Sequence, residues 1–322
     1  MRPKLLLTRR WPSQVETELQ AIYDVTTDAG DRKLGPEALA KAMLAHDVLC
    51  PTVSDRLDAD ILLTPQARVR LIASYGVGFD HIDLDAARAA GIVVTNTPDV
   101  LTDATADLAM LLMLMATRRA GEGERELRAG NWSGWRPTHL MGQSLAGKTL
   151  GVVGLGRIGR AVASRAHHGF GMRIAYHDQH RPPRDVEASL EARYVDSVEA
   201  LAARCDVLTL HCQGGAQTHH LVNRALLARM KPTAVVVNTA RGSVVDEAAL
   251  AEALRTGVIA AAGLDVFETE PTVHAGLRAL ENVVLLPHLG SATLETRVAM
   301  GRRAAANIAA FLSGQEPSDR VA

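Results

Sequence analysis

Short apolar runs alternate with longer stretches of helical periodicity along most of this chain. Apolar runs bounded by polar segments are typical of buried strands, and helical segments between them indicate βαβ units with a parallel sheet. The N-terminal third follows this pattern throughout. Its predicted strands are Leu5–Leu7, Asp47–Cys50, Ile61–Leu63, Leu71–Ala73 and Ile92–Thr95, and its clearest predicted helices are Leu34–Leu44 and Leu84–Ala90.

The same alternation begins again near the middle of the chain. We therefore expect an α/β fold of two Rossmann-like, doubly wound parallel-sheet domains with an active-site cleft between them. The pattern over Leu294–Leu312 predicts a final helix, and the residues after Gly314 are expected to fray. The strands of the second domain are predicted at Thr149–Val153, Arg173–Tyr176, Val207–His211, Ala234–Asn238, Ala261–Leu264 and Val283–Leu286.

A helix and an irregular segment separate the two patterns. Leu108–Ala116 is apolar on every face, which predicts a helix buried all round at a domain or subunit contact. The charged stretch Glu122–Arg128 follows, and then the irregular segment Gly130–Gly142 with Trp132 and Trp135. Two interpretations remain open for this segment: a surface excursion, or an arm that packs on a second subunit.

Composition excludes several classes of protein. With 35 Lys and Arg against 36 Asp and Glu, the net charge is −1 and gives no general attraction to nucleic acid or anionic membrane. The apolar run Leu108–Ala116 is far shorter than the roughly 20 residues that span a bilayer. The three cysteines show no CxxC spacing, so we expect no disulfide framework, no metal site and a cytoplasmic location. Aromatic residues are only 3%, so the core must be aliphatic.

A glycine-rich loop follows the first strand of the second pattern. Gly154-Leu155-Gly156-Arg157-Ile158-Gly159 reads GxGxxG, directly after Thr149–Val153 and directly before a predicted helix at Gly159–Ala166. The motif alone is a weak signal, but this strand–loop–helix context predicts a dinucleotide site. Gly154 permits the tight turn, Gly156 lets the backbone approach a pyrophosphate, and Gly159 allows close packing of helix on strand. The helix N-terminus then attracts the phosphates.

An acidic residue ends the next predicted strand. Asp178 can accept hydrogen bonds from both ribose hydroxyls and would repel a 2′-phosphate, which favours NAD(H) over NADP(H). Four basic side chains in the same region could instead meet a 2′-phosphate, so NADP(H) remains the alternative. They are His177, His180, Arg181 and Arg184.

Three polar side chains follow later predicted strands. Arg241, Glu270 and His288 each come after a strand, where ligands bind in open α/β sheets. Histidine can exchange a proton near neutral pH, a nearby carboxylate favours its imidazolium form, and arginine can hold a substrate carboxylate. The trio therefore suits reduction of a carbonyl, although Glu268 is a competing carboxylate two residues from Glu270.

Four motifs in order, GLGRIG, NTARGSVVDEAAL, GLDVFETEP and LLPHLGSAT, resemble those of the D-isomer-specific 2-hydroxyacid dehydrogenases. The segments beginning YGVGFDHIDL and GWRPTHLMG are most similar to the glyoxylate/hydroxypyruvate reductase branch. The resemblance implies that His288 is the acid/base, Glu270 its partner and Arg241 the substrate anchor, with the N–H groups of Val77 and Gly78 binding the substrate carboxylate. It also implies a homodimer that uses the apolar helix and the arm.

The resemblance further implies a cofactor site and a division of the chain. The substrate-binding, flavodoxin-like domain would comprise residues 1–100 and 287–322, and the NAD(P)-binding Rossmann domain residues 101–286. One departure is Gln213-Gly214-Gly215, which stands where the family commonly has proline after the preceding strand. The implied cofactor contacts are Gly154, Gly156, Arg157, Ile158, Gly159, Asp178, Thr105, Cys212, Thr218, Thr239, Ala240, Asp265 and Gly290.

These features predict an oxidoreductase that reduces a small 2-oxo acid to the D-2-hydroxy acid with NAD(P)H. Glyoxylate and hydroxypyruvate are the expected substrates, with the proton coming from His288. Two alternatives stay open: a dehydrogenase of another 2-hydroxy acid, of the 2-ketogluconate or D-lactate type, and a non-enzymatic NAD-sensing protein on the same fold.

Overall fold

The computed structural model describes residues 2–322, which divide into two compact units. The first unit runs to Leu101 and resumes at Ser291, and the second comprises Thr102–Gly290. The second unit ends at Gly290, four residues beyond the boundary predicted at residue 286. His288 therefore belongs to the same unit as the glycine-rich loop.

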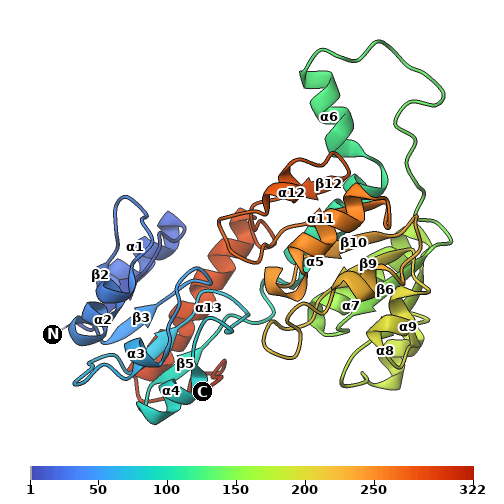
Figure 1. Cartoon of the computed structure of the whole chain (residues 1–322). Helices are drawn as coiled ribbons and strands as arrows, with labels where there is room; N and C mark the ends of the chain where they lie inside the picture. Colours follow the sequence, from blue (N-terminus) through green and yellow to red (C-terminus); the bar gives the residue numbers. More distant parts are fainter. Residues whose placement is uncertain (1) are drawn as a thin grey trace. The chain divides into compact units, whose positions relative to one another are not determined.

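The first unit is a five-stranded parallel sheet in the order β2-β1-β3-β4-β5, which is the flavodoxin-like order. Helices pack on this sheet, and the last of them joins the C-terminal part of the chain to the N-terminal part (Figure 1). The strands are β1 (Lys4–Leu7), β2 (Asp24–Thr26), β3 (Val48–Cys50), β4 (Leu71–Ala73) and β5 (Val93–Thr95). The helices are α1 (Ser13–Ile22), α2 (Pro36–Ala45), α3 (Ala59–Leu62), α4 (Leu84–Ala89) and α13 (Leu294–Leu312).

One predicted strand of this unit is wrong. Ile61–Leu63 lies at the end of helix α3, where the Asp58 side chain caps the helix by accepting a hydrogen bond from the Ile61 N–H at 3.4 Å. Ile61 and Leu62 are buried as expected, but a short apolar run cannot by itself distinguish a buried strand from a buried helical turn.

The C-terminal residues do not fray as predicted. The N–H of Val321 donates to the carbonyl of Val94 at 2.8 Å, so the tail pairs with strand β5. Asp319 is buried and anchors the tail, since its carboxylate accepts hydrogen bonds from Arg303 at 2.7 Å and from Asn307 at 2.9 Å. This anchor depends on long-range partners on α13, which local sequence pattern does not reveal.

The second unit is a seven-stranded parallel sheet in the order β12-β11-β10-β9-β6-β7-β8. Counted from its own first strand, β6, the order is the doubly wound one of dinucleotide-binding folds, with the direction of winding reversing between β6 and β9. The strands are β6 (Thr149–Val153), β7 (Arg173–His177), β8 (Arg193–Tyr194), β9 (Val207–Leu210), β10 (Val235–Asn238), β11 (Ala261–Leu264) and β12 (Val283–Leu285).

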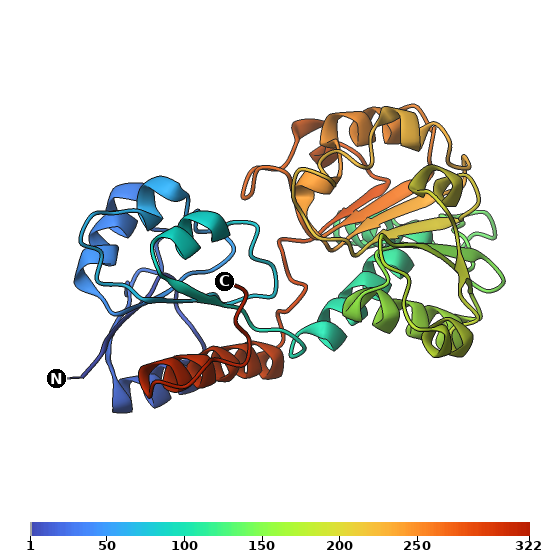
Figure 2. The same ribbon diagram turned by 90° about the horizontal axis from the view of Figure 1, so that it is seen from below.

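Helices cover both faces of this sheet (Figure 2). One face packs against α5 (Thr102–Thr117) and α7 (Arg157–Ser164), and each face has its own aliphatic core. A short π-helix, Arg165–Gly169, extends α7. The opposite face packs against α9 (Val198–Ala202), α10 (Arg224–Leu227), α11 (Glu247–Arg255) and α12 (Ala275–Arg278). The outer strands β7 and β8 are joined by α8 (Arg184–Ser189).

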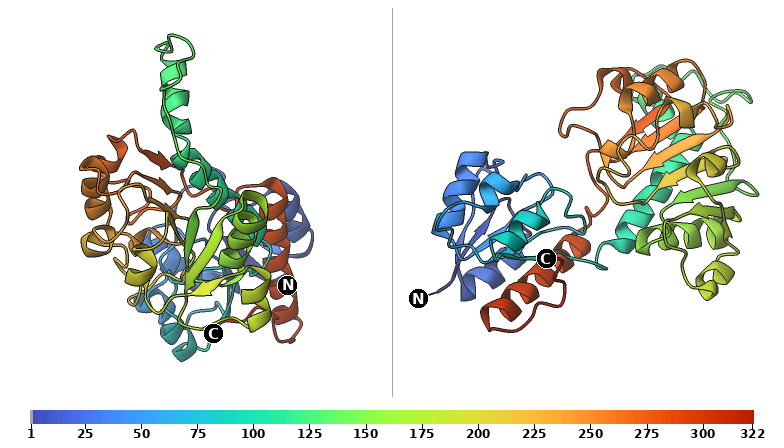
Figure 3. Two further views of the ribbon diagram at one scale, coloured as in Figure 1. Left: turned by 90° about the vertical axis from the view of Figure 1, so that its right-hand side faces the viewer. Right: turned by 60° about the horizontal axis from the view of Figure 1, so that its bottom comes forward.

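Helix α5 is largely but not wholly buried in this chain. Leu112 and Met113 are completely buried, whereas Leu111 is 45% exposed, so the predicted burial all round is not met within one chain. Helix α6 (Ala120–Arg128) follows and projects from the body of the second unit together with the loop after it (Figures 1 and 3). No helix within residues 2–322 combines the length and apolar character needed to cross a membrane.

Candidate active site

The carboxyl ends of neighbouring strands in the second unit carry the polar residues singled out by the sequence. Gly154 follows β6, Thr239 follows β10, Asp265 follows β11 and His288 lies just beyond β12. Because all these strands are parallel, their carboxyl ends share one edge of the sheet. That edge, at the point where the winding reverses, is where open α/β sheets bind their ligands.

Two glycines of the loop after β6 are required by packing. Gly154 has a φ of 89°, and a Cβ there would lie 2.8 Å from the carbonyl carbon of His211. A Cβ on Gly159 would lie 2.1 Å from the carbonyl oxygen of Gly154, so only glycine lets α7 pack this closely on the loop.

Gly156 has a different role from its neighbours. A Cβ built on it meets no atom within 4 Å, so the loop presents bare backbone to open space at that point. Gly156 is also the N-cap of α7, and no side chain caps the first N–H groups of that helix. An uncapped helix N-terminus beside exposed glycine backbone fits the pyrophosphate of a dinucleotide. Arg157 and Ile158, the first two residues of the helix, lie beside this position.

The Asp178 carboxylate is held against the loop. Its Oδ2 accepts a hydrogen bond from the N–H of Leu155 at 2.6 Å, and its Oδ1 accepts one from the N–H of His180 at 3.0 Å. The side chains of His180, two residues on, and Arg184, at the start of α8, are exposed. The fold therefore places a negative charge next to the predicted pyrophosphate position.

Two of the basic side chains near Asp178 are engaged elsewhere. Arg181 pairs with Glu187 at 2.8 Å, and its guanidinium lies 4.7 Å from the centre of the Tyr194 ring. The Nδ1 atom of His177 lies 2.9 Å from the carbonyl oxygen of Val195. These contacts draw both side chains toward strand β8 and its neighbours rather than toward Asp178.

Asp265 organises the segment around His288. Its two carboxylate oxygens accept hydrogen bonds from the N–H groups of Leu289 at 2.6 Å and Gly290 at 2.8 Å. Thr105 donates from its hydroxyl to the carbonyl of Gly290 at 3.2 Å, so these implied cofactor contacts meet at one place. Burial raises the pKa of Asp265, although these two N–H groups and the charge of His288 act in the opposite direction.

The turn after β10 presents an unsatisfied hydroxyl. The Oγ1 of Thr239 is buried and has no hydrogen-bond partner in the part of the chain that the structure describes. Asn238 holds the turn by accepting from the N–H of Ala240 at 3.0 Å and donating to the carbonyl of Arg241 at 2.8 Å. A buried polar atom without a partner is unusual and is consistent with a ligand at this position.

His288 and Glu270 form a directed pair. The Nδ1 of His288 lies 2.9 Å from Oε2 of Glu270, and Oε1 of Glu270 accepts a hydrogen bond from the N–H of Phe267 at 3.1 Å. Burial by itself would raise the pKa of Glu270, but the hydrogen bond and charge of His288, together with the charge of Arg241, hold it below its usual value. This contact occupies Nδ1 of His288 and leaves Nε2 as the ring nitrogen that does not face Glu270.

The competing carboxylate, Glu268, does not contact His288. It lies instead 2.6 Å from Nε2 of His220. Glu270 is therefore the carboxylate of the pair.

Two of the implied cofactor contacts, Cys212 and Thr218, lie in a closed turn after β9. The hydroxyl of Thr218 donates to the carbonyl of Gln213 at 2.7 Å, and Gln179 donates to the Gln217 side chain at 3.2 Å. Gly215 has a φ of 136°, which only glycine adopts readily, so this turn needs glycine where the family commonly has proline nearby. Burial raises the pKa of the Cys212 thiol to about 11, which keeps it protonated and unreactive.

His211 is a polar residue of this edge that the sequence did not single out. Burial lowers its pKa to about 3, so its imidazole is neutral, and Nε2 lies 2.9 Å from the Thr209 hydroxyl. Its Nδ1 has no hydrogen-bond partner within residues 2–322. The available signal was its position at the end of a predicted strand, the same signal that identified the other strand-end residues.

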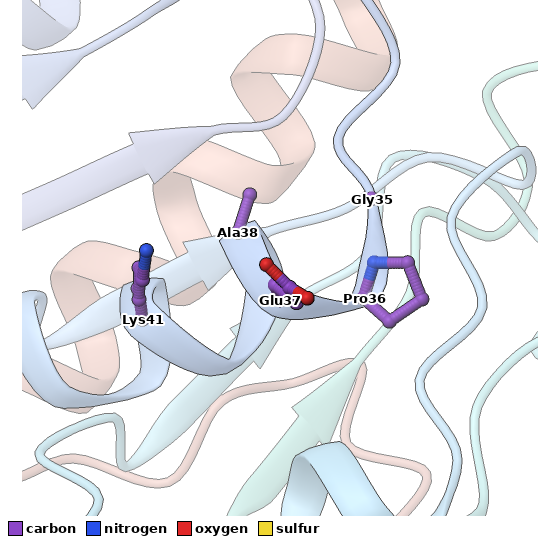
Figure 4. A pocket seen from close by; sticks show the side chains of 5 residues that line it. All are labelled: Gly35, Pro36, Glu37, Ala38 and Lys41. Carbon is purple, nitrogen blue, oxygen red and sulfur yellow. The ribbon is translucent and has the colours of Figure 1, made fainter.

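Val77 and Gly78 belong to the first unit and follow its strand β4. The side-chain amide of Asn96 donates to the carbonyl of Val77 at 2.7 Å and fixes the turn. The first unit also has a surface hollow at the start of α2, around the Glu37 and Lys41 side chains (Figure 4). Its lining contains none of the candidate site residues and consists of Gly35, Pro36, Glu37, Ala38 and Lys41.

A doubly wound sheet with a glycine-rich loop and a histidine–carboxylate pair at its carboxyl edge defines a nucleotide-dependent dehydrogenase fold. The family model described as "D-isomer specific 2-hydroxyacid dehydrogenase, NAD binding domain" matches residues 110–290. The chain belongs to this family.

Full-length relatives support the assignment. A glyoxylate reductase of Thermococcus onnurineus is 42% identical over 325 residues, covering 100% of this chain and 96% of the relative. The crystal structure of a glyoxylate reductase from Paecilomyes thermophila superposes with a TM-score of 0.88 at 34% identity, covering 99% of this chain and 98% of that one. The structure of an NADPH-dependent glyoxylate/hydroxypyruvate reductase from Sinorhizobium meliloti, in complex with NADP and malonate, superposes with a TM-score of 0.89 at 37% identity. The match covers 100% of this chain and 97% of that one.

The two glycines Gly156 and Gly159 should respond differently to alanine. Gly159→Ala should lower the free energy of unfolding by about 1–3 kcal/mol or more, because its Cβ would collide with the loop backbone. Gly156→Ala should unfold like the wild type, because its Cβ points into open space, yet bind NADH at least about tenfold more weakly because the methyl group would occupy the place of the pyrophosphate.

Chemical denaturation and calorimetric titration with NADH measure the two effects separately. Wild-type NADH affinity in a folded Gly156→Ala variant would show that the pyrophosphate does not pass over this residue.

Proposed function

We propose that this protein reduces a small 2-oxo acid to its 2-hydroxy acid with a nicotinamide cofactor, and that glyoxylate and hydroxypyruvate are its substrates. The observation that carries the proposal is the pairing of His288 with Glu270 at 2.9 Å, on the strand edge that also holds the glycine-rich loop. Relatives named as glyoxylate reductases over the full length of the chain support the choice of acid.

His288 is the proton donor in this proposal. A bound nicotinamide would supply the hydride for the carbonyl carbon of the acid. The Nε2 of His288, protonated while Nδ1 is held by Glu270, gives its proton to the carbonyl oxygen, so the product is the neutral hydroxyl. The ionised Glu270 makes this possible near neutral pH because it stabilises the imidazolium before the transfer.

Arg241 and backbone N–H groups bind the acid. An arginine guanidinium can hold a carboxylate through two parallel hydrogen bonds and polarise the adjacent carbonyl group. Arg241 is fixed at the end of β10 by its Nη1, which donates to the carbonyl of Ala240 at 2.8 Å. We infer that the N–H groups of Val77 and Gly78 also bind a substrate carboxylate.

NAD(H) is the cofactor that the loop after β7 favours. The Asp178 carboxylate faces the position next to the glycine-rich loop, where it can accept hydrogen bonds from ribose hydroxyls and repel a 2′-phosphate. Arg181, the strongest candidate for binding a 2′-phosphate, is paired with Glu187. The exposed Arg184 is the group that could still favour NADP(H), the cofactor named for the Sinorhizobium relative.

A homodimer would cover the exposed apolar side chains of the second unit. Leu111 on α5 is 45% exposed, Leu127 on α6 is 62% exposed and Trp135 in the following loop is 82% exposed. The loop returns to α6 through His139, whose Nε2 lies 3.0 Å from the Glu126 carboxylate, so it has a defined shape. Contiguous exposed apolar surface marks protein interfaces, and we infer that a second copy of the chain covers these three side chains.

His288→Asn should abolish most turnover with glyoxylate and hydroxypyruvate and leave NADH affinity unchanged. The variant lacks the proton donor, and a loss of about 10²–10⁴-fold in kcat is expected for a general acid. Loss of NADH absorbance measures turnover, and calorimetry measures NADH binding.

Glu270→Gln is the matched control for His288→Asn. It keeps the hydrogen bond to Nδ1 but removes the charge, so its rate should fall less than that of His288→Asn. Unchanged turnover in His288→Asn would refute the assigned role. No turnover by the wild type with these acids, pyruvate or 2-ketogluconate, despite tight NADH binding, would favour the NAD-sensing alternative.

Asp178→Ala should shift cofactor preference toward NADPH. Removal of a charged hydrogen-bond acceptor should lower kcat/KM with NADH by about ten- to a hundredfold, while NADPH no longer meets a repelling charge. Asp178→Asn is the control, because it removes the charge but keeps an acceptor for the ribose. A wild-type enzyme that already prefers NADPH would contradict the proposed cofactor.

The wild-type protein should sediment as a dimer of the 34.4 kDa chain. Trp135→Glu places a charge on the proposed interface and should shift the mass toward one chain. Ile22→Glu, at a residue that is 61% exposed on α1, is the matched control and should leave the dimer intact. A wild-type mass of one chain in sedimentation equilibrium would exclude the proposed dimer.

A further inference from the structure

Two adjacent histidines and a glutamate form a cluster apart from the histidine–carboxylate pair. The Nε2 of His220 lies 2.6 Å from Oε1 of Glu268, and the Nε2 of His219 lies 3.9 Å from the same oxygen. The two imidazole rings are stacked with centroids 4.0 Å apart. One ligand atom from each of the three residues falls within 4.8 Å of the others, and the cluster is open to solvent.

The fold brings these residues together from separate segments. His220 has a φ of 49°, and its N–H donates to the carbonyl of Ser243 at 2.8 Å, which lays the turn beside the segment after β10. A Cβ on Gly242 would lie 1.8 Å from the carbonyl carbon of Phe267, so that segment is packed directly on the backbone that leads into Glu268. Backbone contacts therefore bring the segments that carry the three residues together.

A buried carboxylate holds the third residue in place. The Oε1 of Glu247, at the start of α11, accepts a hydrogen bond from the N–H of Glu268 at 2.7 Å, and its Oε2 accepts one from the N–H of His274 at 3.1 Å. Because Glu247 is only 6% exposed, these hydrogen bonds are shielded from solvent and hold the backbone at Glu268. The Glu268 side chain faces His220.

We propose that His219, His220 and Glu268 bind a divalent transition metal ion of the zinc type. Two imidazole nitrogens and one carboxylate oxygen are a ligand set that suits zinc, cobalt, nickel and copper, whereas magnesium and calcium prefer oxygen alone. A tetrahedral ion with ligands at about 2.1 Å needs ligand atoms about 3.4 Å apart, within reach of small side-chain rotations from the distances present. Water would take the fourth position, because the cluster is exposed.

An ordinary hydrogen bond accounts for only part of the geometry. It explains the short contact between His220 and Glu268 but not the second imidazole stacked beside it with its Nε2 near the same oxygen. The chain contains a contrasting histidine pair, His167 and His168. Their rings lie edge to face at 80°, and each Nδ1 is within 3.1 Å of a backbone carbonyl oxygen.

The expectation of no metal site rested on the spacing of the cysteines. The proposed ligands lie in a turn and in the loop before Glu270, so their proximity is a property of the fold. A bound ion would replace the hydrogen bond between His220 and Glu268 and join the two segments at one point. It would raise the thermal stability of the second unit without contacting His288.

The test is titration of the chelator-treated, full-length protein with Zn²⁺ by calorimetry, and with Co²⁺ by visible absorption. One equivalent should bind per chain. His219→Ala, which leaves the His220–Glu268 hydrogen bond in place, should weaken binding at least about tenfold, and Glu268→Gln should do the same. His168→Ala and His288→Asn should bind like the wild type, and NADH binding should confirm that each variant is folded.

Three results would overturn the proposal. They are the absence of stoichiometric binding, undiminished binding in the folded His219→Ala variant, and loss of binding in His288→Asn. The last result would place the ion at the histidine–carboxylate pair described above. Because the readout is metal binding, a failure of the proposed reductase activity would leave this test unaffected.

Discussion

Parallel pairing of the seven strands in the second unit is the constraint on which the candidate site depends. It brings the turn after every strand to one edge, although the residues concerned are spread from Gly154 to His288. The close contact of Gly159 with the carbonyl of Gly154 then fixes the start of α7 at this edge. A helix N-terminus and exposed backbone at a fixed position give the phosphate-binding end of the site, and the remaining strands carry the groups suited to proton transfer.

Buried carboxylates hold the loops of this edge in position. Asp265 accepts from two consecutive backbone N–H groups beside His288, and Glu247 accepts from two N–H groups on either side of Glu270. These hydrogen bonds satisfy backbone N–H groups of the loops and fix the course of the chain there. The pair His288–Glu270 is thus held by two rigid neighbours.

The sequence predicted the second unit better than the first, for a physical reason. Most strands of the second unit have four or five residues with a buried apolar run, and the glycine-rich loop marks where one strand ends and a helix begins. In the first unit the strands are three or four residues long, so Ile61–Leu63 was indistinguishable from a strand. The edge strand β2 (Asp24–Thr26) contains one apolar residue and no pattern that could reveal it.

For the site residues too, the sequence shows features that are local, but not those that depend on contacts between distant segments. A strand end is visible in the sequence, so Asp178, Arg241, Glu270 and His288 could be selected from it. The sequence does not show which carboxylate faces which histidine, because Glu268 and Glu270 differ only in the direction that the loop gives them. The closeness of His219 to Glu268 likewise arises from packing of Gly242 against Phe267, a contact between segments far apart in the chain.

The pKa values of Asp265 and Glu270, two carboxylic acids near His288, shift in opposite directions. The shifts distinguish the carboxylate that pairs with His288 from the one that holds its backbone. Burial raises the pKa of Asp265, so the cost of ionising it reduces stability as pH rises above the ordinary carboxylate pKa. The pKa of Glu270 is lowered in spite of burial, so its ionised form stabilises the native state above the ordinary carboxylate pKa, and this contribution is lost as pH falls through the lowered value. The oxygens of Asp265 are already occupied by backbone N–H groups. Glu270 therefore supplies the negative charge beside Nδ1 of His288, while Asp265 fixes the backbone that carries His288.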